Sequence, residues 1–113
     1  MSKSVVAGLA GAVVALGLAV VPAQAQSAPT ASELCGWAPR ESLTAIGTIV
    51  KSKAAVHTGP GQECLVTEHR ALNSPVEIFC KYRNSAQNIW YNTTFGWIYS
   101  PYIDIDRGTV ATC

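Results

Sequence analysis

Residues 89–103 read IWYNTTFGWIYSPYI, and this stretch decides the fold expected for the chain. Aromatic and β-branched residues dominate its two halves, 89–93 and 95–99, and such residues favour strands. Because a single residue separates the halves, they predict a tight hairpin. Ser100-Pro101-Tyr102 predicts one helical turn after the hairpin, since Pro suits the first turn of a helix. A final strand is expected over residues 103–106.

Upstream of this hairpin, short apolar runs are separated by Gly, Pro and Asn. Thr58-Gly59-Pro60-Gly61 is the strongest turn signal, because Gly permits a positive φ and Pro fixes its own φ. No stretch shows the 3.6-residue periodicity of an amphipathic helix. Five or six short strands in about 65 residues predict a small all-β barrel or sandwich. The expected upstream strands cover residues 44–51, 53–56, 63–69 and 76–82.

The first 25 residues are expected to be a cleaved export signal. Lys3 precedes an uncharged run over residues 5–21, and small Ala23 and Ala25 stand where a signal peptidase inspects the chain. The alternative is a membrane anchor, although the run is at the lower length limit for a spanning helix. After cleavage we expect a disordered leader and a short pinned segment over residues 26–43, followed by one folded domain over residues 44–113.

The charge balance of the exported part limits its partners. The chain has eight basic and seven acidic residues, and removal of Lys3 leaves seven of each. A neutral domain has no basic stripe to follow a phosphate backbone, so nucleic acid is not an expected partner. We expect an extracellular, secreted protein that is monomeric and does not associate with a membrane after signal cleavage.

Four cysteines, Cys35, Cys64, Cys80 and Cys113, follow the export signal. In an oxidising compartment an even number predicts two disulfides, and the spacing fits no C-x-x-C metal or redox motif. No metal or cofactor is therefore expected. Of the three possible pairings we favour Cys64–Cys80, because a hairpin centred at Leu72 would place these residues opposite each other on a buried face. Cys35 and Cys113 would then form the second bond.

Three segments of the chain resemble the bacterial SH3 family (SH3b, SH3 type 3). AAVHTGPG at 54–61 resembles the family's LNVRSGPG segment, Trp90-Tyr91 its WY strand, and GWIYSPYI at 96–103 its GWVSSSYL ending. The chain departs from the family at His57, where Arg is frequent, and in the RNSAQN loop at 83–88. It also carries Cys64 and Cys80, which typical members lack.

The resemblance implies a small SH3-like barrel and a small secreted protein of the actinobacterial type. Domains of this family commonly target peptidoglycan or other cell-envelope polymers, and many are attached to cell-wall hydrolases. The present sequence contains no hydrolase domain. We therefore expect it to act as the targeting module alone.

Aromatic residues are the main candidates for ligand contact. Eight of the nine lie between Phe79 and Tyr102, and aromatic faces suit a saccharide or peptide groove. Alternation along the strand puts Trp90 and Asn92 on one face, and we expect Trp90 to be exposed. His57 enters the 58–61 turn and is expected to rim the groove, the alternative being a solvated loop histidine. The expected ligand-binding residues are His57, Trp90, Asn92, Tyr99 and Tyr102.

Core packing is the alternative role for these rings, and it is favoured for Tyr91 and Trp97. Catalysis is not expected, because the cysteines are used in disulfides and the nucleophile, zinc and phosphate-loop motifs are absent from the sequence. The sequence thus predicts a non-enzymatic module that binds a cell-wall polymer or a short peptide. The alternative is a secreted protein inhibitor or effector scaffold that presents the loop at 83–88.

Overall fold

The expected hairpin is present in the computed structural model, which describes residues 34–40 and 42–113. Strands β6 (Ile89–Thr93) and β7 (Trp97–Tyr99) pair antiparallel, the 3-10 turn η4 (Ser100–Tyr102) follows, and β8 (Ile103–Gly108) continues the chain. Gly96 closes the hairpin at a φ of 138°, which a residue with a side chain rarely adopts. The expected export signal, and the leader up to residue 33, lie outside the described residues.

All strands join one sheet, and the expected all-β fold is confirmed. The order is β4-β3-β7-β6-β5-β2-β8, with antiparallel neighbours, and β9 adds to β5 in parallel. Eight strands exceed the expected five or six, and the two-residue β9 has no signal in the sequence. Within residues 34–40 and 42–113, no helix has the length and hydropathy needed to cross a membrane. The remaining strands are β2 (Ala45–Ile49), β3 (Ala54–His57), β4 (Val66–Arg70), β5 (Pro75–Arg83) and β9 (Ala111–Thr112).

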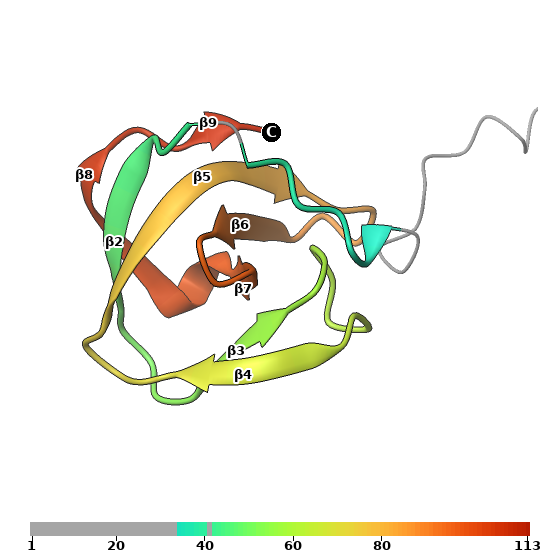
Figure 1. The fold of residues 1–113 in the computed structure, drawn as a ribbon, viewed down its shortest axis with the longest axis horizontal. Helices are drawn as coiled ribbons and strands as arrows, with labels where there is room; N and C mark the ends of the chain where they lie inside the picture. Colours follow the sequence, from blue (N-terminus) through green and yellow to red (C-terminus); the bar gives the residue numbers. More distant parts are fainter. Residues whose placement is uncertain (1–33, 41) are drawn as a thin grey trace, which may run out of the picture.

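The sheet bends around one apolar core. Figure 1 shows β3 and β4 on the opposite side of the domain from β5, with β2 and β8 joining the two sides. Every one of these strands except β4 contributes buried side chains to the core, and β7 contributes Ile98. Examples from the other strands are Ile49, Val56, Ile78 and Ile103. Burial of such side chains provides the main favourable free energy of folding.

The hairpin expected around Leu72 is wrong. β4 pairs with β3, whereas β5 pairs with β2, β6 and β9. Two backbone hydrogen bonds give the reason: Asn73 N–H donates to the Ile49 carbonyl at 2.8 Å, and Ile49 N–H donates to the Ser74 carbonyl at 2.9 Å. These bonds set the start of β5 beside β2, so β4 and β5 do not face each other.

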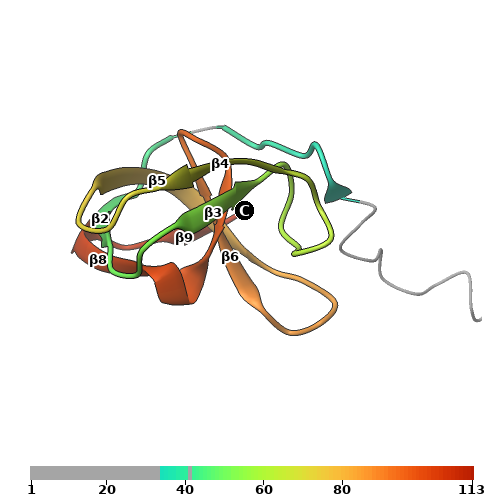
Figure 2. The ribbon, with the colours of Figure 1, turned by 90° about the horizontal axis from the view of Figure 1, so that it is seen from below.

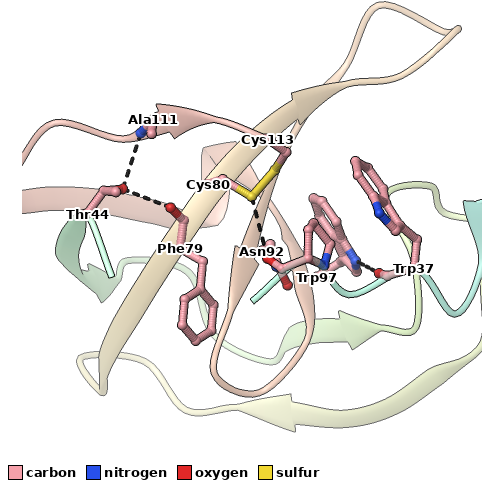
Figure 3. The surroundings of a disulfide bond; sticks show 9 residues. Trp37, Thr44, Phe79, Cys80, Asn92, Trp97, Ala111 and Cys113 are labelled. Atoms are coloured by element: carbon pink, nitrogen blue, oxygen red, sulfur yellow. Dashed lines mark hydrogen bonds between the residues drawn. A yellow bond between two sulfur atoms is a disulfide. The ribbon is translucent and has the colours of Figure 1, made fainter. Parts of the chain in front are cut away.

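The favoured disulfide pairing is therefore wrong as well, although all four cysteines are bonded. The bonds are Cys35–Cys64 and Cys80–Cys113. Cys64 precedes β4 and lies in a turn, where the segment around Cys35 reaches it. Cys113 reaches Cys80 because β9 runs along β5, and Cys113 N–H donates to the Lys81 carbonyl at 2.9 Å. Figure 3 shows this second bond, together with the Thr44 hydroxyl that bridges β9 and β5.

Residues 34–40, here called the strap, cover part of the outer face of the sheet. The Trp37 ring stacks on Trp97 with a centroid separation of 5.5 Å and meets Tyr82 edge-on at 5.1 Å. The Trp37 carbonyl accepts a hydrogen bond of 2.6 Å from Trp97 Nε1, as Figure 3 shows. The strap thus shields the Trp97 ring from solvent and provides the hydrogen-bond acceptor for its indole N–H.

Ile78→Ala is expected to lower the free energy of unfolding by about 2–5 kcal/mol, because Ile78 is fully buried and its loss leaves a cavity in the core. Urea denaturation followed by circular dichroism measures the change. Leu65→Ala is the matched control, since Leu65 is 71% exposed and its truncation should cost less than about 0.5 kcal/mol. Equal losses in the two variants would contradict the location of the core.

Candidate functional site

The outer face of β3, β7 and β6 carries a row of large side chains. The register sets Trp90 opposite Tyr99, and Trp97 opposite both His57 and Asn92. Directly opposed residues of antiparallel strands project to the same side of the sheet, so these five residues share one face. The strap covers the Trp97 end of this row, and the remainder forms a cleft.

The cleft encloses about 220 Å³ and draws its walls from four parts of the chain. The contributing parts are β3, the turn at residues 58–64, the end of the β5–β6 loop together with β6, and β7 together with η4. None of the residues that line the cleft carries a carboxylate, ammonium or guanidinium group. Lys51 is not one of the lining residues, but its Nζ lies 5.4 Å from the centroid of the Tyr102 ring. The lining residues are Ala55, His57, Gln62, Asn88, Trp90, Tyr99 and Tyr102.

His57 is fixed in one orientation. Its Nδ1 donates a hydrogen bond of 2.9 Å to the Cys64 carbonyl, because a carbonyl oxygen can only accept. The neutral ring therefore keeps Nε2 as its acceptor atom. The ring also meets Trp90 edge-on, with a centroid separation of 4.9 Å, and is only 8% exposed. His57 is thus an ordered wall of the cleft, and the alternative of a solvated loop histidine does not apply.

Trp90 was expected to be exposed, and this is wrong. Its side chain is 4% exposed, because His57 packs on one side and Tyr99 lies tilted against it at 5.3 Å. The Trp90 indole N–H has no hydrogen-bond partner within the described residues. A buried donor left unpaired costs about 1–3 kcal/mol, so the burial of the Trp90 indole lowers the stability of the domain by this amount.

Asn92 shares the face of Trp90, as expected, but it lies outside the cleft. It is fully buried, and its Nδ2 donates a hydrogen bond of 2.7 Å to the Pro39 carbonyl of the strap. Its role is therefore to hold the strap on the sheet.

The β5–β6 loop is ordered by Asn84, which is 4% exposed. Its Oδ1 accepts from the backbone N–H groups of Ala86 at 3.0 Å and Asn88 at 3.1 Å, and its Nδ2 donates to the Pro60 carbonyl at 2.9 Å. Asn88 Oδ1 in turn accepts from the Tyr99 hydroxyl at 3.3 Å. One buried amide thereby connects the loop with the 58–64 turn across the rim of the cleft.

The structure brings together four of the five expected binding residues, His57, Trp90, Tyr99 and Tyr102. Sequence reasoning missed Gln62 and Asn88, which are polar residues in turns without a distinguishing pattern. It also assigned no role to Trp37, which lies far from its partners in the sequence. Within residues 34–40 and 42–113, no cluster of three His, Cys, Asp or Glu side chains is arranged to hold a metal.

Comparison of the chain with protein-family models, curated proteins and solved structures gives no match. The class that fold and site define is a small, all-β domain with two disulfides and an uncharged aromatic cleft.

Asn84→Ala is expected to destabilise the domain by about 1–3 kcal/mol, because it removes three hydrogen bonds and leaves the Pro60 carbonyl without its donor. Thermal or urea denaturation provides the measurement. Ser85→Ala, at the exposed neighbouring position, serves as the control and should leave stability nearly unchanged. A neutral effect of Asn84→Ala would show that the loop does not depend on this amide.

Proposed function

We propose that this chain is a secreted, non-enzymatic module that binds cell-wall peptidoglycan, with a short peptide as the alternative ligand. Binding takes place in the cleft formed by His57, Trp90, Tyr99 and Tyr102. The observation that carries the proposal is a cleft of about 220 Å³ whose walls are aromatic rings, the His57 imidazole and two carboxamides.

The chemistry of the walls suits a neutral polar ligand. Tyrosine and tryptophan rings offer flat apolar area at a small cost in side-chain entropy. The carboxamides of Gln62 and Asn88 supply both donors and acceptors, as hydroxyl and acetamido groups require. A charged ligand group would be desolvated in the cleft, and none of the lining residues offers it an ionic partner, which is unfavourable.

The resemblance to bacterial SH3 domains supports an envelope ligand. Each of its three segments contributes to the cleft: 54–61 supplies His57, the WY pair supplies Trp90, and 96–103 supplies Tyr99 and Tyr102. Segments that are separate in the sequence therefore converge on one surface. This convergence is the reason for preferring peptidoglycan over an unrelated ligand.

Secretion is proposed from the N-terminal pattern and is supported by the two disulfides, since such bonds persist in oxidising compartments. Expression in an exporting host should yield a mature chain that begins at Gln26, because signal peptidase cleaves after small residues such as Ala25. Intact-mass spectrometry of culture supernatant makes the measurement. A cell-associated chain that retains residues 1–25 would contradict the export signal.

A secreted protein inhibitor is the second candidate, and the β5–β6 loop favours it. Ser85, Ala86 and Gln87 are exposed, while Asn84 holds the loop rigid from inside. Figure 2 shows this loop projecting from the domain beside β6. A rigid exposed loop loses little entropy on binding a partner protein. Inhibition assays against proteases and amylases separate this function from polymer binding.

Tyr102→Ala is expected to weaken retention on purified peptidoglycan by about tenfold, because the Tyr102 ring and the apolar area that it offers to a ligand would be lost. A sedimentation assay with insoluble peptidoglycan measures retention. Phe95→Ala is the matched control, since Phe95 is also a partly buried aromatic packed against the core but does not line the cleft. No retention of the unmodified protein, or equal losses in both variants, would overturn the proposed function.

A further inference from the structure

The Cys35–Cys64 disulfide joins the strap to the end of the 58–64 turn, and this turn supplies one wall of the cleft. Cys35 belongs to the strap, and Cys64 ends the turn. Gly59 lies against both residues: a Cβ at this position would approach Cys35 Cα to 2.6 Å and Cys64 Sγ to 2.8 Å. In addition, Gly36 N–H donates a hydrogen bond of 2.8 Å to the Thr58 carbonyl. Strap and turn are therefore in close backbone contact, and the disulfide is their covalent link.

A short series of contacts connects this bond with the floor of the cleft. The backbone carbonyl of Cys64 accepts the hydrogen bond from His57 Nδ1. The His57 ring meets Trp90 edge-on, and Trp90 lies against Tyr99. A displacement of Cys64 would remove the acceptor that orients His57. The support of the Trp90 ring would change as a consequence.

We propose that the Cys35–Cys64 disulfide is the positioning element of the cleft, so that its reduction lowers ligand affinity while the domain stays folded. The affinity part of this inference rests on the proposed binding function, whereas the positioning part does not. Preorganised binding groups lose less entropy when a ligand binds, so an unrestrained turn weakens binding even if every side chain is retained.

The domain keeps its other connections when this bond is reduced. Cys80–Cys113 holds β9 on β5, and its surroundings share no residue with the cleft lining. Trp37 remains stacked on Trp97, and the Pro39 carbonyl still accepts from Asn92. The apolar core lies on the other face of the sheet. Reduction is therefore expected to act on the turn and the cleft, not on the fold.

The reduction itself needs an external dithiol. One thiolate of the dithiol attacks Cys35 Sγ, since Cys35 is exposed and Cys64 is 3% exposed, and Cys64 leaves as a thiolate. The second thiol of the reductant then displaces Cys35 and closes a disulfide within the reductant. Two electrons and two protons pass from the dithiol to the protein, which ends with two free thiols.

A ligand-free experiment tests the positioning role. The double variant Cys35→Ser with Cys64→Ser is compared with the control Cys80→Ser with Cys113→Ser, by circular dichroism and by ¹⁵N NMR of the three tryptophan indoles. We expect the first variant to shift or broaden the Trp90 indole resonance and to speed the solvent exchange of the His57 Nδ1 proton. The control should leave both signals in place. An unchanged Trp90 resonance, or a first variant that is unfolded, would overturn the inference.

A second arm measures affinity with soluble probes, the N-acetylglucosamine tetramer and solubilised peptidoglycan fragments. Titration should show about tenfold weaker binding for the first variant and little change for the control. Treatment of the unmodified protein with limiting dithiothreitol should reproduce the loss, and reoxidation should reverse it. Failure of the unmodified protein to bind either probe would count against the proposed function, and the NMR comparison would still decide the positioning role.

Discussion

The rest of the structure depends on the packing of the strap against the outer face of the sheet. A curved sheet of this size has room for only a thin core on its inner side. Trp37 and the strap carbonyls convert part of the outer face into a second buried layer, where Trp97 and Asn92 find both packing and hydrogen bonds. Without this layer, two large or polar side chains would lie on an open sheet surface.

The two disulfides act where this arrangement is held by few other contacts. Cys35–Cys64 fixes the strap where it meets the 58–64 turn, and Cys80–Cys113 fixes the two-residue strand β9. The bonded cysteines are 29 and 33 residues apart in the sequence. Both bonds therefore reduce the conformational entropy of the unfolded chain, which stabilises the folded state. Small domains often need such links because their cores alone provide little stability.

The cleft is the part of the outer face that the strap leaves uncovered. Its walls are neutral and consist of aromatic rings, the His57 imidazole and the carboxamides of Gln62 and Asn88. His57 is held by the Cys64 carbonyl of the 58–64 turn, and Asn88 by the Asn84 side chain of its own loop, so the loops shape the site as well as the strands.

The sequence alone determined the hairpin within residues 89–99, the turn at 58–61 and the all-β class. It also determined that all four cysteines form disulfides, although not which cysteines pair. Strand propensity and turn geometry depend on neighbouring residues, and an even number of cysteines without a metal-binding spacing favours disulfides, so these features can be read from the chain. The strand pairing of β4 and β5, the identity of each disulfide and the burial of Trp90 and Asn92 were decided only by the tertiary structure. Each of these features depends on a distant segment of the chain, as does the Trp97–Trp37 hydrogen bond, whose partners are 60 residues apart in the sequence. Alternation along a strand shows which residues share a face, but it cannot show which segment covers that face.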